Sequence, residues 1–351
     1  MPSDYGYPNA RIRGMKSHLL DASFFQKLIA EQSLQDIVSL LTKTPYGPDI
    51  NAAMIKYKGI RGVDEGLRLN VMQAFRKVYE IVNAEERRLV VILIGRWDVA
   101  NIKTILRGKQ IGVTAELIQE SLIPAGELDE NVLREIAMQI DVKSCIDLLA
   151  TWEIPYAQPL NDTFPEFVKT GRLSPLELAL DKFYYEESLR RLRKRSLNTG
   201  LVKEILIREI DFTNIMTILR CVREELPASD AEVYLIPGGK ELSFDRAKSL
   251  LEKSDVEDVI FELQDTSYYD VLKNKLESYF ERGSLSVLER RMEEMIVRKG
   301  ISMFKGDPLS IALIIGYIWA KYNEVINLRI IARGKVVGMP EERIREALVL
   351  A

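Results

Sequence analysis

The chain has 351 residues, and 47% of them are hydrophobic, so it can bury a substantial core without disulfide bonds or metal ions. Its 49 basic and 52 acidic side chains leave a formal charge of −3, which argues against a surface that neutralises nucleic-acid phosphates. Two cysteines are too few for a disulfide framework, and we expect neither a secretion signal nor a membrane-spanning segment.

A repeat with a period of 113 residues organises the sequence. Residues 98–107 (DVANIKTILR) match residues 211–220 (DFTNIMTILR) at seven of ten positions, and residues 324–333 (EVINLRIIAR) follow at the same spacing. The register continues outside this block, because LIPAG at 122–126 recurs as LIPGG at 235–239, and Tyr156 pairs with Tyr269. Such self-similarity predicts that one structural unit is present three times.

The same period predicts where the copies begin and end. Repeat 1 spans residues 57–169, repeat 2 spans residues 170–283, and repeat 3 spans residues 284–351. The third copy runs out of chain early, whereas residues 1–56 resemble the second half of a repeat. We therefore expect the N-terminal segment to complete repeat 3, which would close the body as a three-part ring.

The repeated blocks have the periodicity of amphipathic helices. Apolar residues step by three, four or seven positions from Leu201 to Val222 and from Ile311 to Val325. Equivalent positions are apolar in all three copies, which predicts three core columns: Val99, Phe212 and Val325; Ile102, Ile215 and Leu328; Ile105, Ile218 and Ile331. Alternation with a period of two is nowhere sustained. The sequence therefore predicts an all-α fold.

Local signals predict where these helices begin and end. A cation followed by a glycine predicts two helix ends with left-handed caps, at Arg107-Gly108 and Arg333-Gly334. A capping side chain followed by proline predicts two helix starts, at Ser174-Pro175 and Asp307-Pro308. Passages rich in proline and glycine predict connections at 44–49, 154–165 and 227–243.

Each repeat carries an acid, an asparagine and an arginine at the same positions. The three sets are Asp98, Asn101 and Arg107; Asp211, Asn214 and Arg220; Glu324, Asn327 and Arg333. Acid and asparagine lie one helical turn apart on one face, and aspartate and asparagine are poor residues for a helix interior. One interpretation is that the arginine reaches an acid on the neighbouring repeat and sets the geometry between repeats. The other is that the sets are solvated polar faces copied by duplication. Neither interpretation is catalysis.

Other motifs give no sign of chemistry. The only histidine is His18, and Gly238-Gly239-Lys240 lacks the residues that complete a phosphate-binding loop. We therefore expect no catalytic, cofactor-binding or metal-binding residue and no direct nucleotide binding. The basic run at 190–195 could bind anionic lipid or an acidic surface, but Glu186 and Glu187 favour a salt-bridged surface helix. Loops around Tyr46, Tyr156 and Tyr269 are either contact surfaces or plain turns.

Four segments together resemble a known family: YPNARIRGMKSHLL near the start, RWDVANIKTILRGK and EIDFTNIMTILR inside, and YNEVINLRIIARGK near the end. They look like the C subunit of A/V-type ATPases, which is similar to the d subunit of the eukaryotic vacuolar enzyme. The resemblance covers essentially the whole chain. It implies three similar helical subdomains arranged with pseudo-threefold symmetry as a funnel or ring.

The resemblance also implies a non-catalytic role in ATP synthesis and ion transport. A peripheral subunit at the cytoplasmic face of the membrane would link the central shaft, made of D-type and F-type subunits, to the proteolipid rotor ring. It would thereby couple ATP turnover to proton or sodium translocation. The alternative is a freestanding helical-repeat adaptor for cytosolic proteins. An adaptor should hold its ends apart, whereas the coupler should bring residues 9–46 beside residues 284–351.

Overall fold

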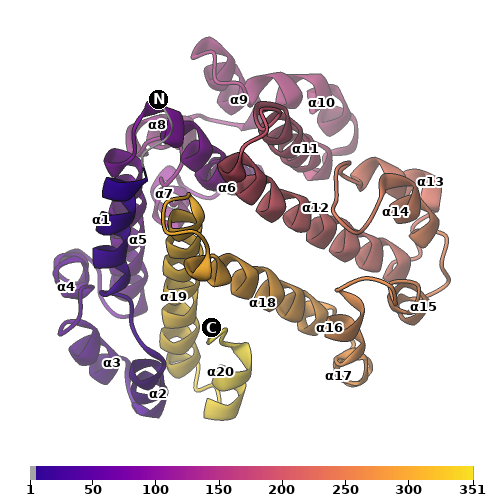
Figure 1. Cartoon of the computed structure of the whole chain (residues 1–351). Coiled ribbons are helices and arrows are strands. Elements are labelled where there is room, and N and C mark those ends of the chain that lie inside the picture. Colours follow the sequence, from indigo (N-terminus) through magenta and orange to yellow (C-terminus); the bar gives the residue numbers. More distant parts are fainter. Residues whose placement is uncertain (1–4, 351) are drawn as a thin grey trace. The chain divides into compact units, whose positions relative to one another are not determined.

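The computed structural model describes residues 5–350, and within that range every regular element is a helix. The all-α prediction is thereby confirmed. The chain forms two compact units (Figure 1). Unit 1 consists of Met1–Cys145 together with Gly300–Ala351, and unit 2 consists of Ile146–Lys299.

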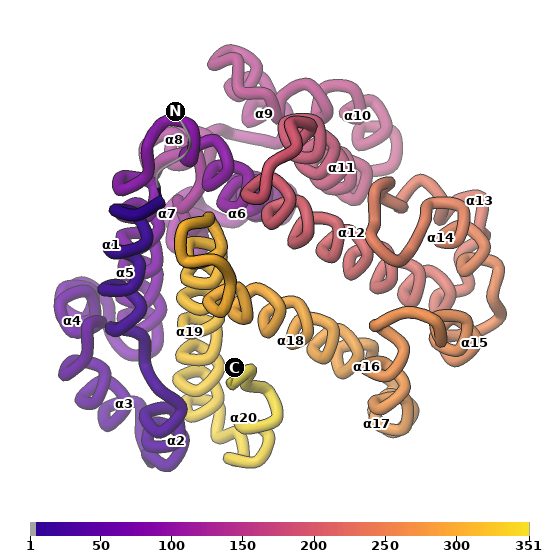
Figure 2. Tube along the Cα trace, viewed as in Figure 1, coloured from indigo at the N-terminus to yellow at the C-terminus, as the bar shows by residue number. Residues whose placement is uncertain are grey.

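Unit 1 combines the beginning of the chain with its end. Its elements are α1 (Gly6–Lys16), α2 (Ala22–Ala30), α3 (Leu34–Leu41), α4 (Gly47–Lys56), α5 (Ile60–Ile81), α6 (Ala84–Gln110), α7 (Ala115–Ser121), α8 (Glu130–Met138), the 3-10 turn η2 (Met303–Lys305), α19 (Ala312–Val336) and α20 (Glu341–Ala347). Helix α19 packs against α5 and is also contacted by α1, α2, α3 and α20. Figure 2 shows the indigo start of the chain beside the yellow helix near its end.

Unit 2 is built around one long helix. Its elements are α10 (Ala157–Thr170), α11 (Ser174–Arg191), α12 (Leu197–Arg223), α13 (Ala228–Ala231), the 3-10 turn η1 (Glu232–Tyr234), α14 (Phe244–Leu250), α15 (Val256–Phe261), α16 (Tyr269–Lys273) and α17 (Leu276–Arg282). Helices α11, α14 and α15 pack on α12, and α10 packs on α11. The unit boundaries fall within α9 (Val142–Thr151) and α18 (Ser286–Ser302).

The three long helices α6, α12 and α19 hold the predicted core columns. Eight of those nine residues are buried, and Phe212 is partly buried against the core of unit 2. The first turns of two of these helices are capped by side chains. Asn83 and Glu86 form a reciprocal capping box on α6, and Ser196 and Thr199 form one on α12. Side-chain caps therefore fix the starts of α6 and α12, and a buried apolar stripe holds all three long helices in place.

Two expected helix ends were wrong by several residues. Helix α6 continues past Gly108 to Gln110, and α19 continues past Gly334 to Val336. The left-handed residues are Gly112 and Gly338, which follow the true ends. Gly108 and Gly334 serve packing instead, since a Cβ on Gly108 would collide with Ile118, and one on Gly334 would press tightly on Ile344.

The expected helix starts and connections also needed correction. Helix α11 begins at Ser174 itself, but α19 begins at Ala312, because Asp307 accepts a hydrogen bond from the Leu309 amide in a turn that precedes the helix. The passage at 154–165 enters α10, the passage at 44–49 enters α4, and the passage at 227–243 contains α13 and η1. Proline fits the first turn of a helix, where the amide has no partner to lose. Pro165 lies further inside α10 but is exposed.

Candidate functional site

The candidate acids and asparagines lie inside the protein, whereas the arginines lie on its surface. None of the six acids and asparagines is more than 4% exposed, and all three arginines are exposed near the C-terminal ends of α6, α12 and α19. The acids and asparagines are therefore not part of solvated faces. A buried polar side chain costs free energy unless hydrogen bonds compensate it, so the partners of these groups define the site.

Each asparagine binds the backbone of the residue 22 positions further along the chain. The Asn101 amide donates to the Ile123 carbonyl at 2.7 Å, and its side-chain oxygen accepts from the Ile123 amide at 2.8 Å. Asn214 makes the same pair of bonds with Ile236, at 2.7 and 2.8 Å. Asn327 makes them with Val349, at 2.8 and 3.1 Å. In each repeat, one asparagine side chain thus satisfies both the amide and the carbonyl of a loop residue.

The two aspartates bind the loop a few residues further on. Asp98 accepts hydrogen bonds from the amides of Glu127 at 2.8 Å and Leu128 at 3.0 Å. Asp211 accepts bonds from three consecutive amides, at 2.7 to 3.2 Å, which belong to Lys240, Glu241 and Leu242. Acid and asparagine on one helical face therefore hold two points of the same loop.

Glycine makes this close approach possible. A Cβ on Gly126 would collide with the Asp98 carboxylate, and a Cβ on Gly239 would collide with the Asp211 carboxylate. These glycines are the last residues of the LIPAG and LIPGG segments. The repeated segment is thus the loop that the acid and asparagine hold, and the glycine is the position where backbone meets carboxylate.

The acid of the third set binds the beginning of the chain. The Glu324 carboxylate accepts hydrogen bonds from the Leu20 amide at 2.5 Å and from the Tyr46 hydroxyl at 2.6 Å, and Lys321 donates to it at 2.9 Å. Lys321 also donates to the Tyr46 hydroxyl at 2.7 Å. Burial lowers the pKa of Lys321, while the adjacent Glu324 carboxylate opposes that shift. Residues more than 270 positions apart in the sequence thus share one buried polar cluster.

Tyrosine hydroxyls donate hydrogen bonds to the acids of the second and third sets. Their positions correct the expected pairing of Tyr156 with Tyr269. Tyr268, not Tyr269, donates to the Asp211 carboxylate, at 2.8 Å, and Tyr268 and Tyr46 are both fully buried. Tyr46, Tyr156 and Tyr268 each precede the first residue of a helix, α4, α10 and α16 respectively. The Tyr46 side chain is therefore a buried partner of an acid, and whether the loop around it is a contact surface stays a prediction.

Burial dominates the electrostatics of the acids. It raises the pKa of Asp98 from 3.8 to about 7, although the Glu127 and Leu128 amides pull in the opposite direction. Burial also raises the pKa of Asp211, against the hydrogen bonds that it accepts from Glu241 and Tyr268. The same burial, reinforced by the Asp211 charge, raises the pKa of the Tyr268 hydroxyl.

Arg220 and Arg333 form ion pairs with acids far away in the sequence. Arg220 on α12 binds Glu289 on α18 at 2.6 Å, and Arg333 on α19 binds Asp64 on α5 at 2.9 Å. Arg107 holds the equivalent position on α6. The acids of the sets themselves are bound by backbone amides, by tyrosine hydroxyls and, for Glu324, by Lys321. Since both ion pairs are partly exposed, each contributes on the order of 1 kcal/mol or less.

Comparison with known proteins identifies the family. The profile of the ATP synthase (C/AC39) subunit family matches residues 8–347. The chain belongs to this family. It is 32% identical to the C subunit of the A-type ATP synthase of Methanosarcina barkeri, over 99% of this chain and 93% of that protein. It is 31% identical to the same subunit of Methanobrevibacter smithii, over 98% of this chain and 88% of that protein. For Methanocaldococcus jannaschii the identity is 29%, over 98% and 86%.

Membership of the C/AC39 family makes the chain a non-catalytic subunit of a rotary ATPase. From residue 5 to residue 350, no group of three or more histidine, cysteine or acidic side chains is arranged to hold a metal ion. Across the same described residues, no helix has both the length and the apolar character needed to cross a bilayer.

The basic run of this C/AC39 chain is partly neutralised, as the sequence suggests. Glu187 binds both Arg190 and Arg191, at 2.6 and 2.7 Å. Glu187, rather than Glu186, therefore provides both ion pairs.

The buried role of Tyr46 and Tyr268 and the packing role of the loop glycines were not predicted from the sequence. A signal was nevertheless present, because TPY at 44–46, IPY at 154–156 and TSY at 266–268 are similar segments, with their tyrosines 110 and 112 residues apart. A strict spacing of 113 residues hides this similarity. The glycine that ends each LIP segment was likewise a usable signal for close backbone approach.

Proposed function

We propose that the chain is the central-stalk subunit that links the rotating shaft of an A/V-type ATPase to its membrane rotor ring. In this role it binds D-type and F-type shaft subunits on one side and the proteolipid ring on the other, at the cytoplasmic face of the membrane. Shaft rotation is thereby coupled to the translocation of protons or sodium ions. The relatives, which are named as C subunits of A-type ATP synthases, support the assignment to this enzyme.

The proposal includes an architecture of three similar helical subdomains with pseudo-threefold symmetry, arranged as a funnel or ring. Residues 57–169, 170–283 and 284–351 form the three subdomains, and residues 1–56 complete the third. The observation that carries this part is the asparagine bond to the residue 22 positions later, which occurs in all three copies. The exclusively helical unit structure is compatible with it.

Stiffness is the property that a torque-transmitting body needs. Protein interiors are packed as densely as organic crystals and resist deformation, provided that no loose ends can slide. Here the Glu324 cluster fastens the start of the chain to α19, and Asn327 fastens the residues just before its end to the same helix. Both ends of the described chain are therefore held by one buried helix.

The same observation argues against the adaptor alternative. A freestanding adaptor of the solenoid type stacks each repeat only on its neighbours, which leaves its two ends apart. In unit 1, α1, α2 and α3 contact α19. An arrangement in which the first residues pack on the last long helix favours a closed body over an open one.

Reconstitution without this chain tests the proposed function. Purified soluble motor and membrane sector are combined in proteoliposomes with and without the chain, and ATP hydrolysis and ion uptake are measured in the same sample. We expect hydrolysis to continue without the chain while ATP-driven ion uptake is lost. Adding back the chain restores uptake, and adding back the surface variant Asn161→Ala restores it equally. Uptake that survives removal of the chain contradicts the coupling role.

A further inference from the structure

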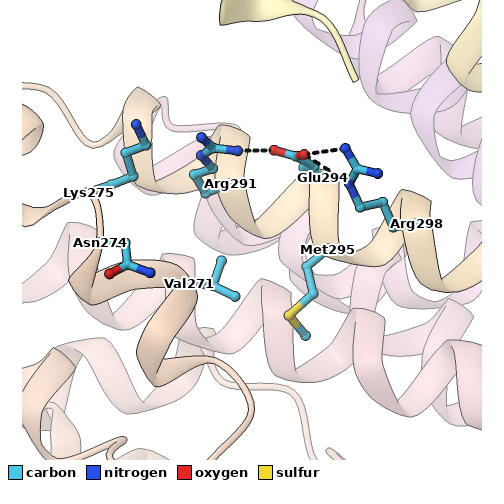
Figure 3. Close-up of a pocket in the computed structure, with 7 residues that line it drawn as sticks. All are labelled: Val271, Asn274, Lys275, Arg291, Glu294, Met295 and Arg298. Carbon is cyan, nitrogen blue, oxygen red and sulfur yellow. Dashed lines mark hydrogen bonds and ion pairs between the residues drawn. The ribbon is translucent and has the colours of Figure 1, made fainter. Parts of the chain in front are cut away.

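Unit 2 contains a pocket that the repeated acid sites do not use. It has a volume of about 380 Å³ and lies between α18 and the connection from α16 to α17 (Figure 3). Seven residues line it: Val271, Asn274, Lys275, Arg291, Glu294, Met295 and Arg298. Figure 3 labels the basic side chains of Lys275, on the connection from α16 to α17, and of Arg291, on α18.

The charged side of the pocket is organised by one glutamate. Glu294 binds Arg291 on one side and Arg298 on the other, where the distance to the Arg298 Nε atom is 2.9 Å. Burial alone raises the pKa of Glu294, but the hydrogen bonds from Arg298 and Arg291 outweigh it and hold that pKa below its usual value. The carboxylate therefore stays charged and keeps both guanidinium groups in place before any ligand arrives.

Positive charge remains after this pairing. The lining carries three cations and one anion, which leaves two positive charges. Lys275 is half-buried, and the structure gives its ammonium group no acidic partner among residues 5–350. Arg291 uses one terminal nitrogen for Glu294, so its other donors can face a ligand. A ligand carboxylate could therefore pair with Lys275 and with the remaining donors of Arg291.

The floor of the pocket is apolar. Val271 and Met295 are both partly exposed and line the space between α16 and α18. Methionine adapts its shape to apolar ligands and is common where proteins bind varied partners. A small apolar floor beside fixed cations suits an aliphatic or aromatic side chain adjacent to an acid. A lipid phosphate would use the cations but not this floor.

We propose that this pocket binds a segment of a partner protein in which an acidic residue stands next to an apolar one. The acid pairs with Lys275 and Arg291, and the apolar side chain covers Val271 and Met295. Two observations support this choice of ligand. The charged residues that line the pocket have a net positive charge, which suits an acid, and its small apolar surface suits one apolar side chain. The inference does not depend on the coupling role, because it rests only on residues within unit 2.

The methyl group of Met295 reports on occupancy. The full chain is labelled with ¹³C-methyl methionine, the Met295 signal is assigned with Met295→Leu, and acetyl-Leu-Asp-amide is titrated. We expect a saturable shift with a dissociation constant on the order of millimolar. Acetyl-Leu-Asn-amide, which lacks the charge, and acetyl-Ala-Asp-amide, which lacks the apolar side chain, should each bind at least about threefold more weakly.

Substitutions in the chain test whether Lys275 and Arg291 are needed to bind the peptide. Lys275→Gln and Arg291→Gln should each weaken the Leu-Asp peptide by about three- to tenfold. Lys273→Gln is the matched control, because Lys273 lies on α16 outside the lining and its ammonium sits over the Tyr269 ring at 5.0 Å. It should leave binding unchanged. Far-ultraviolet circular dichroism verifies that all three variants are folded.

Four results would overturn the proposal. Equal binding of the Leu-Asn peptide would mean an apolar cavity without charge selection, and equal binding of the Ala-Asp peptide would mean non-specific attraction of anions. A Met295 signal that does not saturate would mean that no site exists. If phosphatidylglycerol vesicles shift Met295 in an Arg291-dependent way and the peptide does not, the pocket serves lipid headgroups instead.

Discussion

At the scale of single residues, the buried asparagines are the features most sensitive to change. Asn214 satisfies both the amide and the carbonyl of Ile236 inside the core of unit 2. Asn214→Ala removes both hydrogen bonds and leaves two buried backbone groups without partners. We expect the free energy of unfolding to fall by about 2–4 kcal/mol, measured by urea denaturation.

Asn161→Ala is the matched control for that substitution. Asn161 is exposed on α10, in the same unit. Its replacement should change the free energy of unfolding by no more than about 0.5 kcal/mol. If the two variants lose equal stability, the asparagine bonds to the loops contribute nothing specific.

The raised pKa of Asp98 predicts a pH dependence of stability. Between its usual value of 3.8 and its folded value of about 7, the folded protein holds the Asp98 proton more tightly than the unfolded chain does. The contribution of this group to stability is therefore present in full below the lower value and is lost as the pH rises through the upper one. We expect Asp98→Asn to remove the fall in the free energy of unfolding that comes from Asp98, measured by urea denaturation from about pH 4 to pH 8.

Comparing the natural chain with the Asp98→Asn variant isolates Asp98 from all other titrating groups. Asparagine offers one oxygen acceptor in place of two, so we expect the variant to be less stable than the natural chain at low pH. At high pH the natural chain must bury a charged Asp98, so the two should differ less. A difference between the two proteins that is constant over the whole range would contradict the raised pKa.

At the scale of elements, each long helix and the loop that follows it form one unit. Gly239 is the point of contact, because a Cβ there meets the Asp211 carboxylate and the Leu242 carbonyl. We expect Gly239→Ala to lower the free energy of unfolding by about 1–3 kcal/mol, since the loop must move away from the acid that holds it.

Gly200→Ala provides a control of opposite sign. Gly200 lies in α12, and a Cβ there meets no atom within 4 Å. Alanine should raise stability by about 0.5–1 kcal/mol, because it favours the helix without touching a neighbour. Thermal unfolding of both variants should move the midpoint in opposite directions. Two shifts of the same sign would show that contact with Asp211 does not decide the effect.

At the scale of the whole molecule, the N-terminal segment belongs structurally with the end of the chain. Leu20 and Tyr46 supply two of the partners of Glu324, and both lie in the first 46 residues. Deletion of residues 1–46 leaves Lys321 and Glu324 without these partners and exposes the face of α19 that α1, α2 and α3 cover. We expect amide hydrogen exchange to accelerate in residues 312–336.

Unit 2 provides the internal reference for that deletion. Residues 197–223 form α12 and pack within unit 2, so their protection should be retained. The measurement is hydrogen exchange followed by mass spectrometry on the full and shortened chains. Equal loss of protection in α12 and α19, or no loss in α19, would contradict a local role of the N-terminal segment.

The amino-acid sequence by itself determined the helical architecture and which helix faces are buried. The core columns and the acid and asparagine positions follow from a helical period that occurs three times, so each copy supports the others. The burial of the acids and asparagines did not follow from the sequence, which left a solvated polar face open as one of two interpretations. Only the apolar helix faces thus required no knowledge of the tertiary structure.

Only the tertiary structure decided what the buried groups bind. The partners of Asp98, Asp211 and Asn214 are backbone amides and carbonyls, which every residue carries and which therefore leave no mark in the sequence. Gly108 and Gly334 lie inside their helices and pack closely against Ile118 and Ile344, which a cation followed by a glycine does not reveal. One partner of Glu324 lies 304 residues away at Leu20, and the fold of the chain alone brings these two residues together.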